Sequence, residues 1–97
     1  MQLVARVDEH RFSSLEECRS AGVVVGTLED TAAERLLDKL GIEKRIYDGQ
    51  VEPYGDLALG RIDAVLLDLP IAAYYARPNP KLKYVGQPIG AGHYAIA

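Results

Sequence analysis

The segment from Gly60 to Pro70 constrains the fold more than any other part of the chain. Residues 64–67 are continuously apolar, which is typical of a strand covered on both faces, as in a parallel sheet flanked by helices. Asp68 follows directly, and Pro70 favours a first helical turn, because the missing N–H of proline costs nothing there. The segment therefore predicts a buried strand that delivers a carboxylate to the start of a helix.

Two interpretations of Asp68 remain open from this segment. In open α/β sheets, ligands bind outside the carboxyl ends of the strands, so a charged side chain at this point is well placed to meet one. Aspartate is also a preferred residue for capping the N-terminus of its own helix. The segment by itself does not separate ligand contact from capping.

Composition narrows the class of protein. The 97 residues, 48% of them apolar, suffice for a single domain over residues 1–97, and a net charge of -3 offers no basic footprint for nucleic acid. No stretch approaches the roughly 20 apolar residues that a membrane-spanning helix requires, and the N-terminus lacks the basic and then apolar order of a signal peptide. We therefore expect either a cytosolic protein or an excised piece of a longer one.

Strands and helices alternate along the chain. Capping boxes at Ser13 or Ser14 with Glu16 or Glu17, and at Thr31 with Glu34, mark two helix starts. The expected helices cover residues 14–20, 31–40, 53–59 and 69–77, and the expected strands cover 3–7, 23–25, 45–48, 64–67, 83–86 and 93–97. This order predicts right-handed crossovers and a three-layer α/β sandwich, with a mostly parallel sheet flanked by helices.

The motifs together resemble the second lobe of bacterial extracellular solute-binding proteins of the polar amino-acid family, which have the type 2 periplasmic binding protein fold. The resemblance spans nearly the whole chain in the family's order. It rests on Ser14-Leu15-Glu16-Glu17, Val23-Val24-Val25-Gly26, Thr31-Ala32-Ala33-Glu34, Gly60 to Asp68, Ile71 to Tyr75, Asn79-Pro80, Val85-Gly86-Gln87-Pro88 and Tyr94 to Ala97.

The resemblance implies a function. In that family two α/β lobes close by a hinge over a solute and hand it to a membrane permease of the ABC type. This chain resembles only the second lobe. In the family, two segments that cross the hinge connect the lobes, and the resemblance places them at Leu3, where the chain enters this lobe, and at Ala97, where it leaves. The implied partners are a small solute such as an amino acid, the missing first lobe and the permease, with no nucleic acid and no cofactor. The implied location is periplasmic or extracellular, and the family also allows a membrane tether or fusion to a permease.

The resemblance also implies two ligand contacts. Asp68 matches the carboxylate that pairs with the α-ammonium group of a bound amino acid, a charge-assisted contact that is stronger than a neutral hydrogen bond. The helix that begins near Thr31 and Ala32 matches the one whose backbone N–H groups receive the α-carboxylate, since a helix N-terminus favours an anion.

The sequence departs from the family at this helix start. The family usually has Gly-Thr-Thr there, and this chain has Asp30-Thr31-Ala32. Asp30 adds a side chain and a negative charge where glycine would let a carboxylate approach, and Glu29 increases the repulsion. Two interpretations stay open: Asp30 occupies the anion site itself, which favours a cationic or carboxylate-free solute, or the usual amino-acid binding is retained.

Other residues give weaker signals. Cys18 is expected to be a small buried thiol, Asp63 to be solvated or paired with Arg61, and the two histidines to have surface or hinge roles. No nucleophile has a recognisable base partner, so an enzyme is the least favoured class. The alternative to transport is a ligand-sensing input module of a signalling or cell-wall protein, because the same two-lobed architecture serves both uses.

Overall fold

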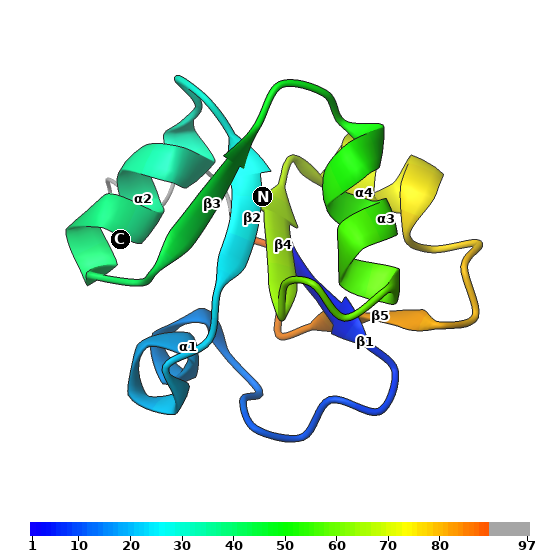
Figure 1. Cartoon of the computed structure of the whole chain (residues 1–97), viewed down its shortest axis with the longest axis horizontal. Helices are drawn as coiled ribbons and strands as arrows, with labels where there is room; N and C mark the ends of the chain where they lie inside the picture. Colours follow the sequence, from blue (N-terminus) through cyan, green and yellow to red (C-terminus); the bar gives the residue numbers. More distant parts are fainter. Residues whose placement is uncertain (90–97) are drawn as a thin grey trace.

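Strands and helices alternate in the computed structural model, which describes residues 1–89 (Figure 1). The elements in chain order are β1 (Gln2–Arg6), α1 (Leu15–Ala21), β2 (Val25–Leu28), α2 (Ala32–Leu40), β3 (Lys44–Tyr47), α3 (Val51–Ala58), β4 (Ala64–Leu67), α4 (Leu69–Tyr75) and β5 (Leu82–Val85). Within residues 1–89, no helix has the length and apolar character needed to cross a bilayer. The strand expected over residues 93–97 lies outside the described residues.

The five strands form one mixed sheet in the order β3-β2-β4-β1-β5. β2 pairs in parallel with both β3 and β4, whereas β1 pairs antiparallel with both β4 and β5. Four strands therefore run in one direction and β1 alone opposes them, which agrees with the expected mostly parallel sheet. β2, β3 and β4 all finish at the same end of the sheet, and we call this end of the strands the carboxyl edge. We call the opposite end, where these strands begin, the amino edge.

Helices cover both faces of the sheet and make three layers (Figure 1). One apolar core joins α1 and α2 to the face that carries Leu3 and Leu66, and a second joins α3 and α4 to the face that carries Val4 and Val65. The whole run over β4 is buried because its alternate side chains enter the two cores. The expected three-layer α/β sandwich is confirmed.

Both predicted capping boxes set the start of a helix. Ser14 Oγ accepts from the backbone N–H of Glu17 at 3.3 Å, while the Glu17 carboxylate accepts from the N–H of Ser13 at 2.6 Å. Thr31 Oγ1 accepts from the N–H of Glu34 at 3.2 Å. Each bond satisfies a donor that a helix start leaves without an intrahelical partner, so α1 and α2 begin where the motifs predict.

Two element starts differ from expectation by two residues. In addition, β2 continues through Gly26 and Thr27 to Leu28 instead of ending at residue 25, and α4 ends at Tyr75 instead of residue 77. β2 begins at Val25 rather than Val23, because the N–H of Val23 bonds the end of α1 at the Cys18 carbonyl and the N–H of Val24 bonds the Asp63 carboxylate. α3 begins at Val51, ahead of Pro53, since proline is tolerated anywhere in a first helical turn.

Candidate functional site

The carboxyl edge places Thr31 and Asp68 after two neighbouring strands. β2 and β4 run in parallel with Val25 opposite Ala64 and Gly26 opposite Val65, so the two strands end side by side. Thr31 follows the end of β2 across a short turn, and Asp68 follows β4 directly. The two sequence-predicted positions therefore share one edge of the sheet.

The Asp68 side chain is exposed and does not cap its own helix. Asp68 occupies the N-cap position of α4, and its carbonyl oxygen accepts from the N–H of Ala72, but its carboxylate accepts no capping bond. None of the ion pairs within residues 1–89 includes Asp68. The carboxylate thus stands at the carboxyl edge without a cation from this part of the chain.

At the start of α2, the Thr31 hydroxyl already donates its one hydrogen bond within the protein. It donates to the Leu28 carbonyl at 2.8 Å and accepts from the N–H of Glu34 at 3.2 Å. The backbone N–H groups of Thr31, Ala32 and Ala33 make no hydrogen bond within residues 1–89, as is usual in a first helical turn. What α2 can offer an anion is therefore backbone N–H groups and the helix dipole, and not the threonine hydroxyl.

Asp30 has a left-handed backbone with φ of 58°. Its N–H donates to the Glu34 carboxylate at 2.8 Å, and Lys44 binds the same carboxylate at 2.9 Å. The bond from Lys44, followed by that from Asp30, lowers the pKa of Glu34. The left-handed conformation accounts for the glycine that the family usually has at this position, and aspartate is one of the few other residues that tolerate it.

The exposed Asp30 side chain makes no hydrogen bond to the start of α2 among the described residues. Thr31 supplies the cap, so the backbone donors that Asp30 would occupy in one of the two interpretations have no partner within residues 1–89. The negative charge of Asp30 nevertheless lies next to them.

Sequence reasoning missed Gln2, which is buried at the carboxyl edge, opposite the residue that precedes Asp68. Gln2 opposes Leu67 in the sheet and is 0% exposed. Its Nε2 donates to the carbonyls of Leu3 at 2.9 Å and Val85 at 3.2 Å, while its Oε1 has no partner within residues 1–89. The available signal was the single polar residue in the otherwise apolar N-terminal run of residues 1–5.

Tyr54 places a second polar group in the same core. Its hydroxyl is buried and has no hydrogen-bond partner within the described residues. Burial, with smaller contributions from Tyr84 and Asp68, raises the pKa of this phenol above its ordinary range, so Tyr54 is neutral and is not a base. Its ring stacks on Tyr75 with centroids 6.0 Å apart, which makes packing its main role.

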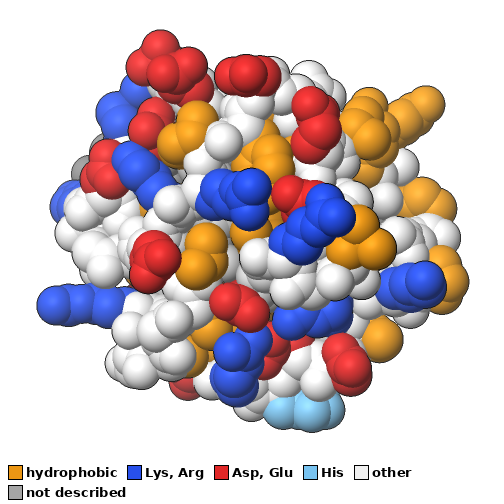
Figure 2. All heavy atoms as spheres, in the orientation of Figure 1, with side chains coloured by type: hydrophobic (Ala, Val, Ile, Leu, Met, Phe, Trp, Pro, Cys, Tyr) orange, Lys and Arg blue, Asp and Glu red, His pale blue; other side chains and the backbone are white. Residues whose placement is uncertain are grey.

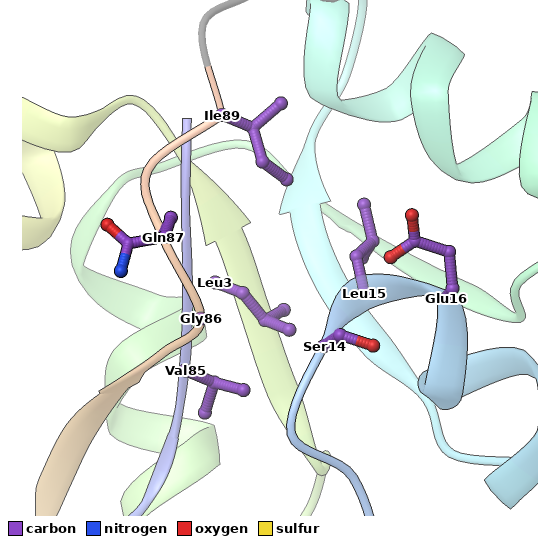
Figure 3. Close-up of a pocket in the computed structure, with 8 residues that line it drawn as sticks. All are labelled: Leu3, Ser14, Leu15, Glu16, Val85, Gly86, Gln87 and Ile89. Atoms are coloured by element: carbon purple, nitrogen blue, oxygen red, sulfur yellow. The ribbon is translucent and has the colours of Figure 1, made fainter.

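A separate pocket of about 140 Å³ lies between the start of α1 and the segment that follows β5 (Figure 3). Leu3, Leu15, Val85 and Ile89 supply its apolar walls, and neither Thr31 nor Asp68 lines it. Its polar lining side chains are those of Ser14, Glu16 and Gln87, so it is a pocket distinct from the carboxyl edge.

Charged residues at the amino edge are paired with one another. Asp63 is bound by Arg11 at 2.7 Å and accepts from the N–H of Val24 at 3.0 Å. Asp63 was expected to be solvated or paired with Arg61, but Arg11 is its partner, and Arg61 lies 3.2 Å from Asp56. The chain folds back through the turn after β1 to bring Arg11 to Asp63, a contact that sequence spacing does not reveal.

The described part of the chain has no metal-binding cluster beside these features, and its single cysteine is buried. Residues 1–89 contain no group of three or more His, Cys, Asp or Glu side chains that could hold a metal ion. Cys18 is buried as expected, and burial raises the pKa of its thiol to about 12. On the face drawn in Figure 2, acidic and basic side chains are interspersed.

Comparison with solved structures identifies the fold. An ancestral arginine-binding protein bound to glutamine superposes with a TM-score of 0.81 at 28% identity, over 92% of this chain and 40% of that one. Domain 2 of TmArgBP superposes with a TM-score of 0.80 at 26% identity, over 92% of this chain and 97% of that one. The GluR0 ligand-binding core from Nostoc punctiforme, in complex with L-glutamate, gives a TM-score of 0.77 at 24% identity, over 91% of this chain and 41% of that one.

The coverage shows what part of these proteins the chain resembles. It spans about two fifths of the ancestral arginine-binding protein but nearly all of the separate domain 2. No family model matches the sequence, and no curated protein matches it. The structural neighbours are binding proteins, and the chain has the fold of one lobe of a type 2 periplasmic binding protein.

Proposed function

We propose that this chain is the second, solute-binding lobe of a two-lobed protein that takes up an amino acid or a related small polar or cationic solute. The observation that carries the proposal is the exposed carboxylate of Asp68, which has no cation within residues 1–89 and follows the strand next to the one that leads into α2. Asp68, Thr31, Ala32 and Asp30 form the proposed ligand-binding edge.

The two groups at this edge match the two charges of an α-amino acid. A carboxylate accepts charge-assisted hydrogen bonds from an ammonium group, and a helix start with open N–H groups receives a carboxylate. Asp30 adds negative charge at the helix start, which favours solutes whose net charge is positive. Structures of an ancestral arginine-binding protein, one bound to arginine and one to glutamine, contain solutes of this class.

Hinge closure with a first lobe is the proposed mechanism. Met1 and Ile89 form a backbone pair, in which the N–H of Ile89 donates to the Met1 carbonyl at 2.6 Å and the Met1 amino group donates to the Ile89 carbonyl. Both lie next to the strand ends that carry the site, so a first lobe joined there would face Asp68. A solute that contacts both lobes only when they are closed stabilises the closed state.

We place the parent protein in ABC-type uptake, in the periplasm or outside the cell. A sensory input module remains the second candidate, because the fold is shared with the GluR0 ligand-binding core and fold alone does not separate uptake from sensing. A neighbouring permease gene favours uptake, and a fused signalling or lytic domain favours sensing.

The test uses the 97-residue chain labelled with ¹⁵N and titrated with L-arginine, L-glutamine, putrescine and succinate. One lobe covers at most half of a ligand, so we expect millimolar binding, seen as amide shift changes at Asp68, Leu69 and residues 31–33. Asp68→Asn should weaken binding of the ammonium-bearing solutes about tenfold or more, since a hydrogen bond to a charged group contributes about 1.5–3 kcal/mol.

Asp8→Asn is the matched control, because Asp8 is also an exposed aspartate but lies in the turn after β1, at the amino edge. It should leave every affinity unchanged. Micromolar binding to this single lobe, or equal binding by the wild type and Asp68→Asn, contradicts the proposal.

A further inference from the structure

The outer side of β5 is an open sheet edge beside a groove. Within residues 1–89, β5 is the outermost strand on its side of the sheet and pairs only with β1. A groove of about 390 Å³ runs between β5 and the end of α4, lined by Ala76, Arg77, Leu82, Lys83 and Tyr84. The groove lies at the far end of α4 from Asp68, so it is separate from the proposed solute site.

The register shows which backbone groups this edge presents. The N–H of Val7 donates to the Lys81 carbonyl at 2.8 Å, and antiparallel pairs alternate, so Lys83 and Val85 bond to β1. Leu82 and Tyr84 therefore point their backbone groups outward. The N–H of Leu82 donates to the Asn79 carbonyl at 3.1 Å. The Tyr84 N–H and the carbonyls of Leu82 and Tyr84 therefore have no strand partner within the described residues.

The charge around the groove is positive although the chain carries a net charge of -3. Arg77 and Lys83 line the groove, and Lys81 lines an adjoining hollow of about 310 Å³. Lys83 donates to the Glu9 backbone carbonyl at 2.8 Å, so its positive charge is not neutralised by that contact. Among residues 1–89, Asp8 is the only acidic residue that lines either hollow.

The charges decide between possible occupants of the edge. Pairing of β5 with β5 of a second copy would bring Lys81, Lys83 and Arg77 of both copies together, and like charges across a strand pair are destabilising. A polyanion without peptide groups would not use the Tyr84 N–H and C=O. We propose that an extended, acidic segment of a partner protein adds to the β5 edge as a further strand, with its carboxylates at Arg77, Lys81 and Lys83.

The probe for this proposal is the peptide acetyl-Glu-Val-Glu-Val-Glu-Val-amide, titrated into the ¹⁵N-labelled chain. We expect slower hydrogen exchange of the Tyr84 amide, amide shift changes along β5, and binding that weakens as salt is raised. The same peptide N-methylated at alternate residues keeps its charge but loses strand hydrogen bonds, and it should bind at least tenfold more weakly.

Charge-reversal variants distinguish the effect of positive charge at the groove on peptide binding from the effect of the net charge of the chain. Arg77→Glu with Lys81→Glu should weaken peptide binding at least tenfold. Arg19→Glu with Arg35→Glu changes the net charge equally at exposed positions of α1 and α2, and it should have a much smaller effect. Failure of the peptide to bind, equal binding of the N-methylated peptide, or equal loss in the two double variants overturns the proposal.

Discussion

The two edges of the sheet hold their carboxylates in opposite ways. At the amino edge, Arg11 binds both Glu9 and Asp63 at 2.7 Å, and Arg6 donates to the carbonyls of Leu57 and Ile62. At the carboxyl edge, Asp68 is exposed and has neither an ion pair nor a capping bond within residues 1–89.

The difference indicates which charges serve the fold and which are free for a ligand. A buried carboxylate such as Glu9, 6% exposed, must be paired because an isolated charge in the interior is costly. An exposed carboxylate costs little when it has no partner, so Asp68 remains available to a cation from outside. The absence of a local partner, together with position at the strand ends, distinguishes the functional candidate from the structural aspartate.

The largest expected effect comes from removing the same side chain at each edge. Asp63→Ala takes the acceptor from the Val24 N–H and one carboxylate from Arg11, so we expect the free energy of unfolding to fall by about 2–3 kcal/mol. Asp68→Ala should change it by less than about 0.5 kcal/mol, since no bond to this side chain is lost. Urea unfolding of both variants measures the contrast, and equal losses would remove the distinction between the edges.

A pH dependence should follow from Glu9. Bonds from the Arg11 side chain, followed by backbone N–H groups of Arg11 and His10, lower the pKa of this carboxyl from 4.5 to about 2. Because the folded-state pKa lies below the unfolded value, the stabilisation is complete above about pH 4.5 and is lost as the pH falls towards 2.

Glu9→Gln checks this dependence. Because the Arg11 side chain is half-exposed, solvent screens its ion pair with Glu9. We therefore expect the free energy of unfolding of the wild type to fall by about 1–2 kcal/mol more than that of Glu9→Gln between pH 6 and pH 3. Denaturant unfolding at the two pH values gives the comparison. A stability difference between the two proteins that stays constant with pH would show that Glu9 does not act through its charge.

The smallest expected effect concerns Asp30 and sharpens the account of the carboxyl edge. Asp30→Asn removes the negative charge but keeps a residue that tolerates the left-handed backbone. We expect binding of a solute carboxylate to improve two- to fivefold, in line with about 0.3–1 kcal/mol for a charge at a helix end. Asp30→Gly also removes the side chain, so a further gain over Asp30→Asn in the same titration would assign the obstruction to its volume. No gain from either variant would show that Asp30 does not oppose the anion.

Much of the framework followed from local patterns. The capping boxes at Ser14 and Thr31 located α1 and α2 because they depend on residues only a few positions apart. The predicted start of β2 was wrong because a distant carboxylate, that of Asp63, binds Val24 and ends the pairing there. Local rules therefore fail where a side chain from another element competes for the backbone.

The sequence by itself determined the three-layer α/β arrangement and the place of Asp68 after a buried strand, since apolar runs, caps and turns act over a few residues. Only the tertiary structure decided that β1 enters the sheet against the other strands, that Gln2 lies buried beside the carboxyl edge, and that Arg11 reaches Asp63 and not Asp68. These outcomes depend on which distant segments become neighbours, and the spacing of residues along the chain carries no record of that choice.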